Sequence, residues 1–298
     1  AKLETFFKEN LDPNQVDREC VIPDKALKGL AELKAFAMKI PEAYGGLGLS
    51  QVNYNRAIHL ISSYCGSTAV VLSAHQSIGV PEPLKQFGTE AQKKKYFPMF
   101  VNGKISAFAL TEPEAGSDPR NMSTTATPSA DGSHYILNGE KLWCTNGLIA
   151  DVICVMAVTP PKIVKGREQK QITAFIVETN SPGFEIVHRC IFMGLHGIQI
   201  GLIRFNNVKV PKENIIIGEG QGLKLALTTL NTGRLTLPAA SVGIGKWCLY
   251  VSREWSGERK QWGMPIGQHE SIGVKLADIA VYTFAMDAMT WMTSFMAD

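Results

Sequence analysis

A loop of mixed character holds three carboxylates that could do acid–base chemistry. The stretch FALTEPEAGSD, Phe108 to Asp118, begins with apolar residues and turns abruptly polar at Glu112, Glu114 and Asp118. Clustered carboxylates can act as a general acid and a general base. They can also be ordinary polar side chains of a loop that Pro and Gly shape. The residues of this stretch leave both interpretations open.

A second stretch is suited to a flat aromatic ligand. In KLWCTNG, Trp143 and Thr145 stand two residues apart, so their side chains point to the same side of a strand. An indole and a hydroxyl on one face form a plausible environment for the isoalloxazine ring of a flavin. The alternative is a core tryptophan followed by a turn residue, because Asn146-Gly147 is a turn signal.

The composition indicates a globular protein and argues against several other classes. The 298 residues are 45% hydrophobic and 19% charged, enough apolar content for a sizeable core and against extensive disorder. The net charge of +3 does not favour nucleic-acid binding. Six scattered cysteines without a CxxC pair indicate reduced, mostly buried thiols. The sequence contains no HExxH motif, so we predict no zinc site.

Membrane and export signals are not found in this sequence. The longest apolar stretch, 148–158, is interrupted by Asp151 and is shorter than the ~20 residues that a spanning helix needs. No charged-then-apolar leader opens the chain, so we expect no signal peptide and no transmembrane segment.

The elements that must position these residues fall into three regions, and together they predict an α+β protein. Residues 1–105 follow the helical period, 106–216 read as an antiparallel β-domain, and 217–298 return to helical periodicity as an incomplete C-terminal bundle. The segment from 277 to 296 is apolar enough to pack inside a bundle. Two interdomain clefts follow from this order, and ligands prefer such clefts.

Several short signals make local predictions. Asp24 is expected to cap a helix that Ile40-Pro41 ends, and Thr89 with Gln92 to form a capping box. Asp131-Gly132 and Asn138-Gly139 predict hairpin turns. We expect the glycines of 218–222 to have a structural role rather than to bind a nucleotide. We expect Pro238 to kink or break its helix.

The motifs in their order resemble the acyl-CoA dehydrogenase family of flavoproteins. The resemblance runs through PEAYGGLGLS, FALTEPEAGSD, LNGEKLWCTNG, FNNVKVPKENII, TGR and ERKQWGMPIGQHES, and it covers nearly the whole chain. It implies non-covalent FAD and a fold of helical domain, β-domain and four-helix domain. That fold agrees with the organisation inferred from periodicity.

The resemblance also implies roles for individual residues. FAD would be bound by Phe108, Leu110, Thr111, Gly116, Ser117, Trp143, Cys144 and Thr145. The FAD of a neighbouring subunit would be reached by Arg259, Trp262, His269 and Glu270, where Glu270 replaces the Gln of many members. The acyl-CoA would be contacted by Ser117, Asn231 and Arg234. Within FALTEPEAGSD this favours a cofactor loop over an acid–base pair.

The chemistry of the family requires a base that these residues do not supply. A carboxylate removes the α-proton of the thioester while the β-carbon passes hydride to the flavin. One family position for this Glu immediately precedes the Arg of TGR, and here it is Gly233. The other lies beyond the last helix, so we expect a truncated chain whose catalytic base lies past residue 298.

The expected function is FAD-dependent dehydrogenation of an acyl-CoA to trans-2-enoyl-CoA, with medium-to-long chains favoured. The expected partner is an electron-transfer flavoprotein, and the expected assembly is a homodimer or homotetramer in the mitochondrial matrix or the bacterial cytoplasm. One alternative is an acyl-CoA oxidase that uses O₂. Another is a non-catalytic assembly protein that keeps the fold. A colourless preparation would exclude the flavin.

Overall fold

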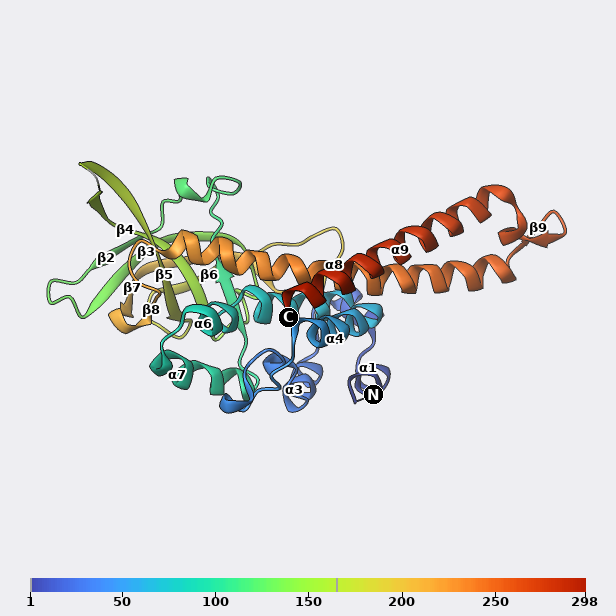
Figure 1. Cartoon of the computed structure of the whole chain (residues 1–298), viewed down its shortest axis with the longest axis horizontal. Helices are drawn as coiled ribbons and strands as arrows, with labels where there is room; N and C mark the ends of the chain where they lie inside the picture. The colour runs from blue at the N-terminus through green and yellow to red at the C-terminus, as the bar shows by residue number, and fades with distance from the viewer. Residues whose placement is uncertain (1, 165) are drawn as a thin grey trace.

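The protein is built from a helical N-terminal region, a β-sheet and a long helical hairpin. The computed structural model describes residues 2–164 and 166–298. Figure 1 shows the N-terminal helices beside the sheet, with helix α8 crossing both before it projects away from the body with α9. The α+β organisation expected from the sequence is confirmed. The domain boundaries near residues 105 and 216 remain a prediction.

Short helices make up the N-terminal region, and they surround a core to which Phe7, Tyr54 and Ile58 contribute fully buried side chains. In chain order they are α1 Lys2–Asn10, α2 Pro13–Glu19, α3 Asp24–Glu32, η1 Ala35–Ala37, η2 Glu42–Tyr44, α4 Gln51–Tyr64, α5 Gly66–Ser73, the π-helical turn η3 Ala74–Ile78, α6 Pro81–Phe87 and α7 Glu90–Val101.

Two of the local helix predictions need correction, and one is confirmed. Asp24 is the first residue of α3, and its N-cap is Pro23. The helix ends at Glu32, well before Pro41, because Lys34 takes a left-handed conformation that turns the chain into η1. The capping box of Thr89 is present as expected.

The central sheet has eight strands in the order β6-β7-β3-β2-β4-β5-β8, with β1 paired to β4. Most pairs are antiparallel, but β4 runs parallel to both β1 and β2. The strands are β1 Ser106–Ala109, β2 Thr125–Pro128, β3 His134–Thr145, β4 Val152–Val164, β5 Arg167–Glu178, β6 Phe184–Arg189, β7 Ile200–Pro211 and β8 Ile215–Ile216, with the short turns η4 Pro119–Asn121 and η5 Lys212–Asn214 beside them.

Only one of the two expected hairpin turns exists. Asp131-Gly132 connects β2 to β3, as its turn signal predicts. The prediction for Asn138-Gly139 is wrong, because these residues lie inside β3 at a register shift against β7. Gly139 has a φ of 142°, and a Cβ there would come within 2.6 Å of the Thr124 hydroxyl. The glycine therefore lies at a β-bulge where Thr124 approaches too closely for a larger residue.

Helix α8, Gly222–Glu258, runs for 37 residues without interruption. Of the expected kink or break at Pro238, the break is therefore wrong. Buried Thr236, Ala239 and Val242 flank the proline, and α8 packs against α4 along this stretch. At its start, a Cβ on Gly222 would lie 2.7 Å from the Thr173 backbone, so this glycine has the structural role given to its loop.

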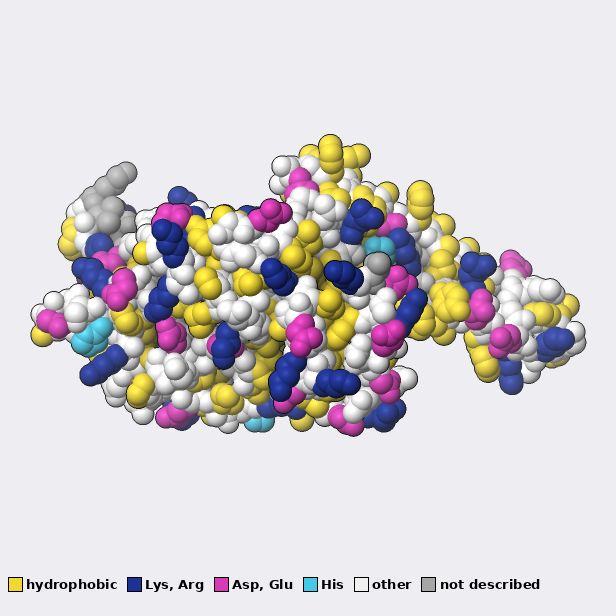
Figure 2. Space-filling view, turned by 90° about the horizontal axis from the view of Figure 1, so that it is seen from below, with side chains coloured by type: hydrophobic (Ala, Val, Ile, Leu, Met, Phe, Trp, Pro, Cys, Tyr) yellow, Lys and Arg dark blue, Asp and Glu magenta, His cyan; other side chains and the backbone are white. Residues whose placement is uncertain are grey.

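The α8–α9 hairpin carries an apolar surface. It continues through β9 Lys260–Gln261, β10 Met264–Pro265 and η6 Ile266–Gln268 into α9 Glu270–Ala297, whose buried residues are Thr283, Thr290 and Ser294. Figure 2 shows apolar side chains along the part that projects. None of the helices in the described part of the chain has the length and apolarity to cross a membrane.

Candidate functional site

Glu112 is an anchor of its loop and not a free carboxylate. Its oxygen lies 2.8 Å from the Lys141 ammonium, and the two side chains are 3% and 0% exposed. The same carboxylate accepts hydrogen bonds from the Ser123 amide and hydroxyl and from the Thr124 amide. Burial alone would raise the pKa of Glu112, but the Lys141 charge and these hydrogen bonds lower it to about 2.

The other two carboxylates of the loop do not form a pair with Glu112. Asp118 accepts from the Arg120 amide and from the Asn121 side chain, so it caps η4. Glu114 is exposed at a tight turn in which Glu112 and Ala115 exchange backbone hydrogen bonds. The acid–base interpretation of this loop therefore has no geometric support.

The first part of the loop is tied to strand β3. The Lys141 ammonium donates to the Leu110 carbonyl at 3.2 Å, and the Leu142 amide donates to the Thr111 carbonyl at 2.9 Å. Phe108 belongs to β1 and is buried, whereas Gly116 and Ser117 are exposed. The two stretches first considered for chemistry thus lie side by side.

Within β3 the side chains face in different directions. The Cys144 thiol is buried and lies 3.5 Å from the Phe108 carbonyl, and burial raises its pKa to about 12. Only the Cys144 backbone could therefore meet a ligand. Trp143 is 50% exposed, beside Phe192, and its φ of 56° coincides with a register shift of β3. The regular alternation of side chains between the two faces of β3 is thus interrupted at Trp143.

Thr145 reaches a cavity of about 350 Å³ between the helical regions and the sheet. Two helical stripes form its walls. One comes from α5 and η3 with a spacing of three and four residues, and the other from α8 with the same spacing. The lining residues are Val70, Ser73, Ala74, Ser77, Ile78, Thr145, Leu230, Gly233, Arg234 and Leu237.

This cavity brings one predicted flavin residue, Thr145, together with one predicted substrate residue, Arg234. Thr145 shares it with Arg234 and with Gly233, the position where some family members carry the base. Asn231 is exposed and accepts a hydrogen bond from Arg234 at 2.9 Å, so it lies beside the cavity. The cavity wall formed by η3 was not predicted from the sequence. A signal for it was present in the run His-Gln-Ser at 75–77, three polar residues inside an apolar helical stretch.

The residues predicted to reach the FAD of a neighbouring subunit lie apart from the cavity. Arg259, Trp262, His269 and Glu270 gather where α8 turns into α9, at the far end of the projecting hairpin (Figure 1). Trp262 is 87% exposed and its ring meets that of His269 edge-on at 5.3 Å. Within one chain the structure does not bring these residues to Thr145.

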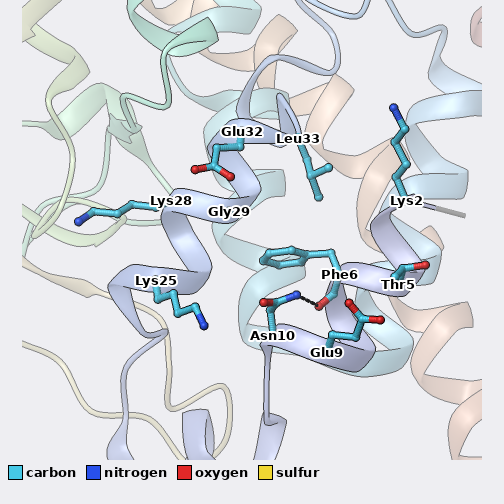
Figure 3. A pocket seen from close by; sticks show the side chains of 10 residues that line it. All are labelled: Lys2, Thr5, Phe6, Glu9, Asn10, Lys25, Lys28, Gly29, Glu32 and Leu33. Atoms are coloured by element: carbon cyan, nitrogen blue, oxygen red, sulfur yellow. Dashed lines mark hydrogen bonds between the residues drawn. The ribbon is translucent and has the colours of Figure 1, made fainter.

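A larger groove of about 840 Å³ lies between α1 and α3 and contains none of the predicted residues. Figure 3 shows Phe6 below Gly29, with Lys25, Lys28 and Glu9 around the opening. Its rim carries charges of both signs and lies on the outer helices. The smaller cavity at Thr145 is therefore the candidate site.

Family models match the chain in three consecutive parts. They are the N-terminal domain of acyl-CoA dehydrogenase over residues 1–104, the middle domain over 107–208 and the C-terminal domain over 220–298. The chain belongs to the acyl-CoA dehydrogenase family. The resemblance inferred from the motifs is confirmed.

Individual members of this family resemble the chain over nearly its full length. "Probable acyl-CoA dehydrogenase FadE10" of Mycobacterium tuberculosis is 51% identical over 292 residues, which are 98% of this chain and 44% of that protein. The mitochondrial very long-chain specific acyl-CoA dehydrogenase of Mus musculus is 37% identical and covers 97% of this chain and 44% of its own length. The chain therefore spans less than half of these relatives.

Two solved structures share the fold. The butyryl-CoA dehydrogenase of Megasphaera elsdenii has a TM-score of 0.90 and 36% identity, covering 98% of this chain and 77% of its own. An acyl-CoA dehydrogenase of Bacillus anthracis complexed with FAD has a TM-score of 0.88 and 34% identity, covering 98% of this chain and 50% of its own.

Proposed function

We propose that this chain is the flavin- and substrate-binding part of an FAD-dependent acyl-CoA dehydrogenase that makes trans-2-enoyl-CoA. The observation that carries the proposal is a shared cavity. In it Thr145, expected beside the flavin, meets Arg234, expected to contact the acyl-CoA, and Gly233, the position where some family members carry the base. The walls are mostly aliphatic, which suits an acyl chain. Membership of the family supports the same reaction.

The residues around Thr145 fit a flavin ring. The Thr145 side chain makes no hydrogen bond to another described residue, and it faces the cavity. Trp143 presents half of its surface on the same strand. We propose that the loop and strand residues Phe108, Leu110, Thr111, Gly116, Ser117, Trp143, Cys144 and Thr145 hold FAD, which supplies the hydride acceptor.

The projecting hairpin suits a contact between subunits. Arg259, Trp262, His269 and Glu270 are too far along the hairpin to serve the cavity of their own chain. We propose that they reach the FAD of a neighbouring subunit in a homodimer or homotetramer. A guanidinium such as that of Arg259 pairs well with pyrophosphate oxygens.

The acyl-CoA is assigned to the α8 side of the cavity. Arg234 and Asn231 are exposed and hydrogen-bonded to each other, where a CoA phosphate or amide could reach them, and Ser117 is exposed on its loop. The aliphatic walls exclude water around the reacting carbons, which strengthens hydrogen bonds to the developing enolate. We propose medium-to-long chains, in keeping with the very long-chain relative.

The catalytic base is proposed to lie outside these residues, in a part of the whole protein past residue 298. A side chain at Gly233 would place its Cβ 2.7 Å from Ile78 Cγ2, so a Glu would enter only if Ile78 moved. Glu112 is paired with Lys141, is buried and does not line the cavity. Neither position supplies a free carboxylate to the cavity.

The oxidant is proposed to be an electron-transfer flavoprotein, in the mitochondrial matrix or the bacterial cytoplasm. The test uses the complete protein with its flavin, titrated anaerobically with acyl-CoAs from short to very long chains. Bleaching of the flavin absorbance supports a dehydrogenase. A preparation without flavin refutes the cofactor, and a flavin that no acyl-CoA bleaches refutes the reaction and favours an assembly protein. Rapid reoxidation of the reduced, product-bound enzyme by O₂ identifies an oxidase instead.

A further inference from the structure

The position of the π-helical turn η3 sets the width of the candidate cavity. Ala74, Ser77 and Ile78 of this turn face Gly233 of α8 across the cavity. A Cβ on Gly233 would lie 2.7 Å from Ile78 Cγ2, so the two walls almost touch there. A π-helical turn is an uncommon conformation that other contacts must maintain. The groups that hold η3 therefore decide the shape of the space beside it.

Two consecutive side chains tie the turn to elements on its far side. The His75 ring nitrogens lie 2.8 Å from the Phe36 carbonyl and 2.8 Å from the Ser106 hydroxyl. Gln76 donates its side-chain amide to the Ala35 carbonyl at 2.7 Å. Both side chains are fully buried, where an unpaired polar group would be costly. These bonds hold η3 against η1 and β1.

The next residue ties the turn to the two helices on either side of it. The Ser77 hydroxyl lies 3.0 Å from the Tyr54 hydroxyl of α4 and 3.0 Å from the Thr236 hydroxyl of α8. Of these three, Ser77 alone lines the cavity, and Tyr54 and Thr236 are completely buried behind it. The Lys39 ammonium lies over the Tyr54 ring, 5.4 Å from its centroid. We name Ser77, Tyr54 and Thr236 the hydroxyl bridge.

We propose that Tyr54 and Thr236 are positioning residues for the acyl chain. Through the Ser77 hydroxyl they hold η3 at the distance from α8 that the chain needs. This inference rests on the proposed function, because it takes the occupant of the cavity to be the acyl part of an acyl-CoA. Neither Tyr54 nor Thr236 lines the cavity, so they act on it through Ser77, which does. The Thr236 hydroxyl also accepts a hydrogen bond from the Gln51 side-chain amide at 3.5 Å.

Helix α8 offers a matched control for this idea. Thr229 lies seven residues before Thr236, on nearly the same face of the helix, because two helical turns take about seven residues. It is also fully buried, but its hydroxyl has no hydrogen-bond partner among the described residues. Thr229→Val and Thr236→Val therefore make the same chemical change at two buried sites, and only the second cuts the hydroxyl bridge. Thr236→Val also removes the acceptor of the Gln51 amide, which Tyr54→Phe leaves in place.

The experiment measures binding of an enoyl-CoA and of free CoA to the complete flavoprotein by calorimetry. We expect Thr236→Val and Tyr54→Phe each to weaken enoyl-CoA binding about fivefold, the effect of one lost hydrogen bond. Free CoA has no acyl chain, so its affinity should not change. Thr229→Val should leave both affinities unchanged.

Three results would overturn the proposal. They are unchanged enoyl-CoA affinity in both bridge variants, an equal loss for free CoA, and the same loss in Thr229→Val. If Thr236→Val fails to fold, Tyr54→Phe decides alone, since it keeps the ring. Failure of the proposed function looks different, because a wild-type protein that binds no enoyl-CoA would refute the substrate and this inference together.

Discussion

The Lys141 ammonium lies 2.8 Å from the Glu112 carboxylate, and both side chains are almost completely buried. This pair joins the loop after β1 to the middle of β3. It holds Leu110 and Thr111 beside the strand that carries Thr145. The residue that first suggested acid–base catalysis is therefore part of the framework that places the candidate flavin site.

Breaking this pair should strongly destabilise the protein. Glu112→Gln leaves the Lys141 charge buried without a counter-charge, so we expect the free energy of unfolding to fall by about 3–5 kcal/mol. Urea denaturation at neutral pH measures this. Glu114→Gln, on the exposed side of the same loop, should change neither the free energy of unfolding nor turnover. Equal stability of the two variants would show that the ion pair contributes nothing.

The same pair predicts an acid limit to stability. The pKa of Glu112 is lowered to about 2, whereas an unfolded Glu titrates near 4.3. Its stabilising contribution is present above pH ~4.3 and is lost as the pH falls toward about 2. Urea denaturation across this range should show a smaller acid dependence in Glu112→Gln than in the wild type. An identical slope in both proteins would contradict the assignment.

His75 predicts a second pH effect in a different range. Burial lowers the pKa of His75 to about 4, so the folded state resists protonation. An unfolded His accepts a proton near pH 6.5. The free energy of unfolding should therefore decrease by roughly 3 kcal/mol as the pH falls from ~6.5 to about 4. His75→Gln should be less stable at neutral pH and should lose this dependence, as measured by denaturation at several pH values.

Thr145→Val should slow reduction of the flavin without changing the fold. The threonine hydroxyl faces the cavity and is free to donate to a ligand. Loss of one such hydrogen bond in a dry site should lower the rate of flavin reduction by about tenfold. Stopped-flow absorbance with saturating acyl-CoA measures the rate. Thr127→Val, on an exposed position of β2, is the control and should behave as wild type.

Gly233→Ala should narrow the cavity. The added Cβ would come within 2.7 Å of Ile78 Cγ2, too close unless one wall moves. We expect acyl-CoA affinity to decrease by roughly tenfold, as for other overpacked sites. Ile78→Ala removes the opposing methyl group, so the double variant should regain affinity relative to Gly233→Ala. Calorimetric titration of the four proteins measures the coupling, and strictly additive effects would contradict the contact.

Local sequence patterns by themselves determined much of the fold of this protein. Motif order and periodicity were enough for the three-part α+β fold and the family, because short-range signals such as the Thr89 capping box specify elements that the tertiary structure keeps. Where the tertiary structure imposes a stronger constraint, local signals failed. Pro238 does not stop α8, which packs against α4, and Asn138-Gly139 bulges within β3, which pairs with β7.

Only the tertiary structure decided the pairings that make the site. Glu112 and Lys141 are 29 residues apart, and Ser77 and Thr236 are 159 apart, so no local pattern could pair them. A buried charge or hydroxyl takes whichever partner the packed elements bring within reach. The sequence by itself therefore determined which residue types were present for flavin and thioester chemistry. Packing of η3 against α8 decided which of them share a cavity.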